Sequence, residues 1–309
     1  MPLDMNNLSP RPEVSRFTAL NESLRIAFDA IRTNAVRSAL TILGVAVGVS
    51  VVVAIAAVIT GIRTSVMEVF EASGPNNFMV TRFDFTAVRI SDVGNGRPPW
   101  WDKPEIEAEE ARALTNLPTV DEALYTFQFT TDMSFENHHV RGIQSTGYSS
   151  GWPRYILGDF IAGRDFTPAE VQQNRSLVVL SAELARELFG QRDPIGKRVR
   201  ILNRWRGTQE PFSVVGVFEN DPNVFSNAAN HWAIFPWTAA NRRLRQSTSQ
   251  AQILIVPDDS ISMERAQDEV IATIRGLRGL GPRDENNFAV IGSAQILDLF
   301  NQLTGVFFL

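Results

Sequence analysis

The sequence predicts a mixed α+β domain that follows one N-terminal transmembrane helix. The residues from Ala39 to Ile62 carry no charge and are bounded by Arg37 and Arg63. At ~1.5 Å of rise per residue, such a helix is ~36 Å long and crosses a hydrocarbon core of ~30 Å with some tilt. After this run, strand and helix patterns are mixed without the regular βαβ alternation of a parallel sheet, which indicates the α+β class.

The uncharged run has two other interpretations. A buried core helix seldom stays uncharged over this length. A cleaved signal peptide would fit the A-x-A pattern of Ala54 and Ala56, but its apolar region is only ~7–15 residues long and lies near the start of the chain. Here thirty-eight residues come first. We therefore expect a transmembrane helix over residues 38–62.

The segment before the run predicts the orientation of the chain. Residues 1–19 contain three prolines and mixed charge, and we expect a flexible tail there. Residues 20–37 place apolar side chains at helical spacing, which predicts an amphipathic helix on the cytoplasmic membrane surface, with packing on a soluble partner as the alternative. Arg25, Arg32 and Arg37 precede the span, and basic residues gather on the cytoplasmic side. The N-terminus is therefore expected in the cytoplasm and the main domain outside it.

Residues 63–292 are expected to form a stalk and an exported core domain with up to two subdomains. The helical period continues past the span until Gly74-Pro75 stops it, so the membrane helix should extend as a stalk. Strands are expected at residues 77–85, 123–131, 138–144, 176–180, 197–202, 211–218, 232–236, 252–257 and 288–291, with hairpins around Glu136-Asn137 and between 202 and 211. Helices are expected from Asp102, in capping-box spacing with Glu105, to about Thr115, from Ser181 to Gly190, and from Ser262 to about Leu277.

Residues 293–309 are expected to hold a second stalk and the truncated start of a second transmembrane helix. Ser293 can cap a helix whose apolar density rises to Leu309. Only seven residues remain from Leu303, too few to cross a bilayer. A C-terminal helix that docks on the exported domain is the alternative.

Composition and motifs favour a non-catalytic chain without cofactor or metal. The chain has no cysteine, which excludes disulfides, thiolate metal sites and cysteine nucleophiles, and its net charge of −5 without a basic stripe gives no sign of nucleic-acid binding. His138 and His139 are adjacent in a predicted strand and should point to opposite faces. The run from Gly190 to Lys197 fails as a phosphate loop, because five residues separate its glycines and Arg198 stands where Ser or Thr is needed. A turn that leads into a strand is the simpler interpretation.

Gly44 and Gly48 form a G-x-x-x-G pattern within the predicted span. Glycines four residues apart lie on one helix face and let another backbone approach closely. We expect this face to pack against a partner span in the membrane.

Several short motifs, in order and with consistent spacing, resemble one family. Residues 24–58 resemble the opening of MacB-type, FtsX-like permeases of the ABC transporter superfamily. The resemblance continues in Leu117-Pro118-Thr119-Val120, Val140-Arg141-Gly142, Gly163-Arg164-Asp165-Phe166, Leu188-Phe189-Gly190, Pro194-Ile195-Gly196-Lys197 and Phe212-Ser213-Val214-Val215-Gly216-Val217. Gly163, Arg164, Pro194, Gly196, Lys197 and Gly216 are the family-motif positions that we expect to be structural.

This resemblance implies a function in the bacterial inner membrane. Members of the family have four spans, with a periplasmic core domain between the first and second, and they work as dimers. A separate or fused ABC ATPase binds ATP and drives them, and the periplasmic domains move by mechanotransmission. The implied partners are therefore an ATPase subunit, a second permease copy, a periplasmic adaptor protein and membrane lipid. Two alternatives are an FtsX-like regulator of cell-wall hydrolases, whose exported domain is much smaller, and a single-span sensor or binding module.

Overall fold

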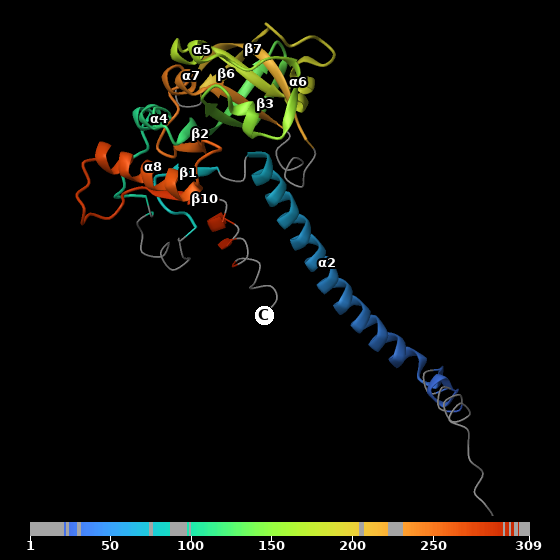
Figure 1. The fold of residues 1–309 in the computed structure, drawn as a ribbon. Coiled ribbons are helices and arrows are strands. Elements are labelled where there is room, and N and C mark those ends of the chain that lie inside the picture. Colours follow the sequence, from blue (N-terminus) through green and yellow to red (C-terminus); the bar gives the residue numbers. More distant parts are fainter. Residues whose placement is uncertain are drawn as a thin grey trace, which may run out of the picture. The chain divides into compact units, whose positions relative to one another are not determined.

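The computed structural model describes residues 22, 25–29, 32–73, 77–86, 98, 100–203, 207–221, 231–292, 294–296, 298–299 and 302. The chain divides into two compact units, Met1–Thr60 and Gly61–Leu309. Figure 1 labels most of the helices and strands named below.

The first unit is dominated by helix α2 (Ala35–Ser73), which runs on for a few turns past the unit's end at Thr60. Its part Ala35–Gly61 is long and apolar enough to cross a membrane. The hydroxyls of Thr41 and Thr60 donate to the carbonyls of Arg37 and Ala56, both at 2.9 Å. These hydroxyls are therefore satisfied within the helix, as a hydrocarbon environment requires. The helix ends at Ser73, where the sequence predicted the stalk to stop.

A turn at Asn34 separates α2 from the helical residues 25–29, 32 and 33 before it. The amide of Ser38 donates to the carbonyl of Asn34 at 3.0 Å, a bond in the first turn of α2. Arg37 therefore lies on α2 and not on the preceding surface helix, which the sequence predicted to extend through residue 37. Residues 1–21 lie outside the described part of the chain.

The second unit contains a ten-stranded sheet in the described residues, and one end of it has a split βαβ arrangement. The strands there lie in the order β10-β1-β9-β2, with antiparallel neighbours. Helix α4 connects β1 to β2, helix α8 connects β9 to β10, and the two helices contact each other. The bounds are β1 (Phe78–Thr81), α4 (Ala108–Thr115), β2 (Val120–Phe135), β9 (Gln252–Pro257), α8 (Met263–Leu277) and β10 (Ala289–Gly292).

The other end of the sheet is inserted between β2 and β9. Strand β2 belongs to both ends, since residues 120–126 pair with β9 and residues 126–135 pair with β3. The pairs β3–β8 and β5–β7 are parallel, so the sheet is mixed, as an α+β fold requires. The inserted elements are β3 (His138–Tyr148), β4 (Gly158–Gly163), α5 (Pro168–Gln172), β5 (Leu177–Ser181), α6 (Ala182–Phe189), β6 (Arg198–Asn203), β7 (Thr208–Asn220), β8 (Trp232–Pro236) and α7 (Trp237–Arg242).

Two clusters of buried side chains form the core. The larger one runs through both ends of the sheet and includes Phe78, Leu114 and Phe212. The smaller one is centred on Trp152 and Phe218, whose ring centroids are 5.1 Å apart. Aromatic packing of this kind contributes to the rigidity of the inserted half.

Most of the predicted elements are present, with shifted bounds. Strands β8 and β9 match their predicted residues, and the β2–β3 hairpin turns at Glu136-Asn137. The start predicted for helix α4 was wrong. The helix begins at Ala108 and its capping box is formed by Glu107 and Glu110, not by Asp102 and Glu105. Residues 104–107, which precede it, are neither helix nor strand, and Ile106 is buried in the core.

Four elements of the inserted half were not predicted. They are β4, α5, α7 and the 3-10 turn Trp152–Tyr155. At the C-terminus, residues 294–296, 298, 299 and 302 are helical. Ser293 and residues 303–309 lie outside the described residues, as does most of the predicted second membrane helix.

Candidate functional site

The chain enters and leaves the sheet of the second unit on adjacent strands. Phe78 begins β1 and pairs with Gly292, which ends β10. Strand β1 lies between β10 and β9, so it is held on both sides. Neighbouring strands are only about 4.8 Å apart. A force on the segment before β1 or on the segment after β10 therefore acts at the same place in the sheet.

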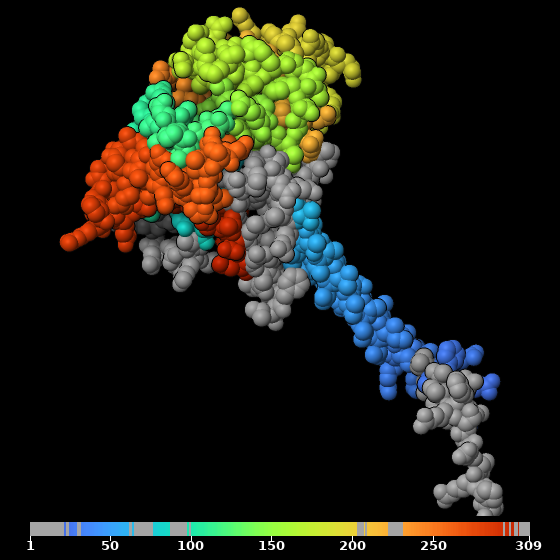
Figure 2. Space-filling model, viewed as in Figure 1, coloured from blue at the N-terminus to red at the C-terminus, as the bar shows by residue number. Residues whose placement is uncertain are grey.

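Arg278 forms a nearly buried ion pair with Glu110 at this end of the sheet. Its Nε donates to Glu110 Oε1 at 2.6 Å and its Nη2 donates to Glu110 Oε2 at 3.0 Å. Both side chains are nearly buried, with exposed fractions of 9% and 8%. Glu110 lies in the first turn of α4 and Arg278 caps the C-terminus of α8, and the surfaces of the two helices meet in Figure 2.

The same guanidinium also contacts the loop that leads into β10. Its Nη1 donates to the side-chain oxygen of Asn287 at 2.9 Å, and its carbon Cζ lies 5.4 Å from the ring centroid of Phe288. Nη2 donates to the carbonyl of Glu105 at 3.2 Å. We call this group of Arg278, Glu110, Asn287 and Phe288 the Arg278 clamp. Sequence reasoning missed it, because Arg278 and Glu110 are 168 positions apart and no local pattern links them.

The motif glycines Gly163 and Gly216 lie opposite each other on β4 and β7. Gly163 has φ +76°, and a Cβ built there would be 2.2 Å from the carbonyl oxygen of Val215. A Cβ on Gly216 would be 2.6 Å from the carbonyl oxygen of Arg164. Two backbones approach too closely here for any side chain, so both positions require glycine.

The next motif residues connect β4 to α5. Arg164 makes two hydrogen bonds to Glu170, each 2.9 Å long. The bond from Arg164 is the main cause that lowers the pKa of Glu170 to about 2. Glu170 also accepts from the amide of Thr167 at 2.8 Å, which completes the capping box of α5.

Asp165 is the centre of a half-buried polar cluster beside them. Its Oδ1 accepts from Trp152 Nε1 and from the amide of Phe166, both at 2.8 Å, and its Oδ2 accepts from the amide of Gly151 at 3.0 Å. Burial raises the pKa of Asp165, although these hydrogen bonds act in the opposite direction. The cluster holds the Trp152 turn against the start of α5, which is a structural task.

Pro194, Gly196 and Lys197 form a turn that leads into β6, as predicted. The amide of Lys197 donates to the carbonyl of Pro194 at 3.1 Å, and Gly196 has φ +75°. The amide of Gly196 and the carbonyl of Lys197 are both bonded to Val214 on β7. These groups are used within the sheet, so the loop is not built to hold a phosphate.

The predicted membrane residues lie on exposed faces of the first unit. A Cβ built on Gly44 or on Gly48 would meet no atom within 4 Å. The face that they share on α2 is thus open. Arg25, Arg32 and Arg37 are exposed.

The described residues contain no group of three or more His, Asp or Glu side chains that could hold a metal ion. His138 and His139 are exposed at the start of β3, and His231 Nε2 lies 2.7 Å from Glu187 Oε2.

The sequence is similar to a family of known proteins. The family described as the MacB-like periplasmic core domain matches residues 38–273. The macrolide export ATP-binding/permease protein MacB of Campylobacter fetus is 24% identical over 84% of this chain and 38% of its own length. The pyoverdine export ATP-binding/permease protein PvdT of Pseudomonas aeruginosa is 25% identical over 92% of this chain and 40% of its own. The chain thus spans about two fifths of the length of these curated relatives.

Solved structures show the same fold. The periplasmic region of MacB from Actinobacillus actinomycetemcomitans has a TM-score of 0.59 at 16% identity and covers 75% of this chain and 96% of that one. The extracellular domain of the ABC-type transporter YknZ has a TM-score of 0.51 at 14% identity and covers 70% of this chain and 100% of that one. The family match covers well over half of the sequence, and the chain belongs to the family of proteins with a MacB-like periplasmic core domain.

Proposed function

We propose that this chain is the N-terminal part of the permease subunit of a MacB-like ABC transporter. The observation that carries the proposal is the family match, which begins at residue 38 within α2 and continues to residue 273 in α8. One apolar helix and one α+β domain thus occur together as they do in this family. In the proposed topology the N-terminus is in the cytoplasm, α2 crosses the inner membrane, and the sheet domain lies in the periplasm.

The proposed mechanism is mechanotransmission without chemistry in this chain. A partner ATPase would bind and hydrolyse ATP in the cytoplasm, and a second permease copy would complete the dimer. Helix α2 extends twelve residues past Gly61, or ~18 Å at ~1.5 Å per residue, so it can carry motion beyond the membrane. The adjacent positions of β1 and β10 support this role, because movement of either connection displaces the same part of the sheet.

The relatives are named for export of macrolides and of pyoverdine, which differ in chemistry. We therefore propose export and assign no cargo. A periplasmic adaptor protein is a further proposed partner. An FtsX-like regulator of cell-wall hydrolases is disfavoured by the size of the second unit, and a single-span sensor is disfavoured by the family match.

Cysteine labelling tests the proposed topology, because the chain has no cysteine of its own. Asn137→Cys places a thiol in the exposed β2–β3 turn, and Asn6→Cys places one in the N-terminal tail. In intact spheroplasts, a membrane-impermeant maleimide should label the Asn137→Cys variant. It should label the Asn6→Cys variant only after lysis. The reverse pattern would refute the orientation and the transporter proposal with it.

A further inference from the structure

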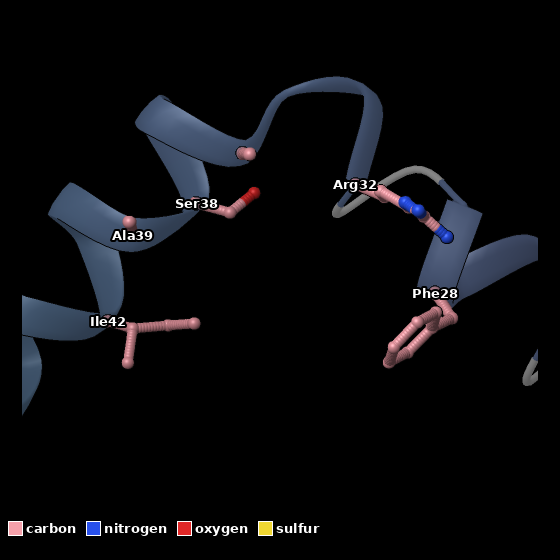
Figure 3. A pocket seen from close by; sticks show the side chains of 6 residues that line it. Phe28, Arg32, Ser38, Ala39 and Ile42 are labelled. Carbon is pink, nitrogen blue, oxygen red and sulfur yellow. The ribbon is translucent and has the colours of Figure 1, made fainter.

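A groove in the first unit lies between the helical residues 25–29, 32 and 33 and the start of α2. Phe28, Arg32, Ala35, Ser38, Ala39 and Ile42 line it, as Figure 3 shows, and its volume is about 470 Å³. Such a volume is within the ~300–1,000 Å³ of small-molecule sites. The groove exists because the chain turns at Asn34, which sets the short helical segment apart from α2.

The lining is polar at one side and apolar at the other. Among the described residues that line the groove, Arg32 is the one with a charge, and the hydroxyl of Ser38 projects from α2 toward the short helical segment (Figure 3). The side chains of Phe28 and Ile42 point into the gap from opposite sides. Ile42 is one helical turn, or ~6 Å, farther along α2 than Ser38. Along the proposed span, the lining thus changes from polar to apolar in the direction of the membrane centre.

The polar side also favours an anion. The first turn of α2 contains no acidic residue, and the N-terminus of a helix carries a partial positive charge. Asp29 is the acidic residue of the short segment, and it does not line the groove. A basic pocket at the cytoplasmic end of a membrane helix has the chemistry that binds anionic lipid headgroups.

We propose that this groove binds one anionic phospholipid of the cytoplasmic leaflet. Arg32 and Ser38 hold the phosphate of the headgroup, and an acyl chain lies along Phe28, Ala39 and Ile42. The bound lipid fixes the short helical segment to the start of α2. Only the assignment of the lipid to the cytoplasmic leaflet rests on the proposed function. The groove itself is formed within one unit of the chain.

Native mass spectrometry of the purified full chain in detergent tests this site. Dioleoyl phosphatidylglycerol should be retained as a single bound molecule, and dioleoyl phosphatidylcholine should be retained less. Arg32→Gln should weaken phosphatidylglycerol binding about fivefold, the effect expected of one basic residue at an anionic lipid surface. Arg25→Gln is the matched control, since it removes the same charge from the same segment outside the groove.

Two further arms separate the site from diffuse attraction. Ala39→Phe should fill the groove and reduce retention of both lipids, and glycerol 3-phosphate should not displace the lipid because it lacks acyl chains. Equal losses in Arg25→Gln and Arg32→Gln would overturn the proposal, as would unchanged binding in Ala39→Phe or equal retention of the two lipids. The experiment involves neither the ATPase nor the orientation of the chain, so its failure differs from a failure of the proposed function in the labelling test.

Discussion

Replacement of Arg278 by methionine should destabilise the sheet domain strongly. Arg278→Met removes the guanidinium and leaves the carboxylate of Glu110 buried, with an exposed fraction of 8%. Loss of one partner from a buried ion pair costs about 3–5 kcal/mol, because the remaining charge is uncompensated. The aliphatic part of methionine keeps most of the packing volume. The cost should therefore come from the charge and the lost hydrogen bonds.

Thermal and urea unfolding of residues 61–309 measure this effect, and the sheet domain falls within this compact unit. In a domain of this size, about 3–5 kcal/mol corresponds to a decrease in Tm of roughly 6–20 °C. Glu110→Leu alone leaves the guanidinium unpaired and should also destabilise the domain. The double variant removes both charges, so its destabilisation should be far smaller than the sum of the two single effects.

Arg112→Gln and Glu109→Gln serve as matched controls for this cycle. Arg112 and Glu109 form an exposed ion pair on α4, with exposed fractions of 65% and 70%, and such pairs contribute at most about 1 kcal/mol. Additive effects of Arg278→Met and Glu110→Leu, or a loss below about 1 kcal/mol in Arg278→Met, would show that the clamp does not act as a buried unit.

Three other predictions follow from the motif residues and the membrane helix. In urea unfolding, Gly163→Ala should lower the free energy of unfolding by about 1–3 kcal/mol more than Gly279→Ala does. Both positions have positive φ, but only Gly163 faces the Val215 carbonyl. Equal losses in the two variants would contradict the close approach. The folded-state pKa of Glu170 lies below its ordinary value of 4.5, so its stabilising contribution is present above that pH and is lost as the pH falls toward about 2. Arg164→Gln should weaken this acid dependence in Tm measurements, because Arg164 is the main cause of the lowered pKa, and an unchanged profile would argue against the pair. In the complete transporter, Gly44→Ile and Gly48→Ile should lower cysteine crosslinking between spans but not membrane insertion, and unchanged crosslinking would show that the glycines are incidental.

Local signals explain why much of the fold could be predicted. Ser181 and Ser262 each cap a helix, with hydroxyls that accept from Leu184 and Arg265, and a cap of this kind is visible in the sequence. The uncharged run of α2 is equally local. By contrast, β4 lies at the edge of the sheet and contains two glycines and an aspartate, which are depleted in strands, so its composition carries no strong strand signal.

The candidate site was predictable only in part, because its contacts are long-range. The sequence identified Gly163 and Gly216 as motif positions, but their mutual approach depends on the pairing of β4 with β7. The Arg278 clamp depends on helices from two distant segments, and the adjacency of β1 and β10 depends on the whole order of the sheet. Such contacts are set by tertiary pairing and leave no periodic pattern in either segment.

We propose that ATP used by a partner moves the sheet domain in the periplasm. Gln191 is an exposed turn residue in a chain without cysteine, so Gln191→Cys can carry a single spin label. Double electron–electron resonance then measures the distance between the labels of two permease copies. In the complete transporter, we expect this distance distribution to shift when ATP binds and to return after hydrolysis, and an ATPase variant that cannot bind ATP should abolish the shift. Identical distributions with and without ATP, in a transporter that hydrolyses ATP normally, would contradict mechanotransmission through this domain.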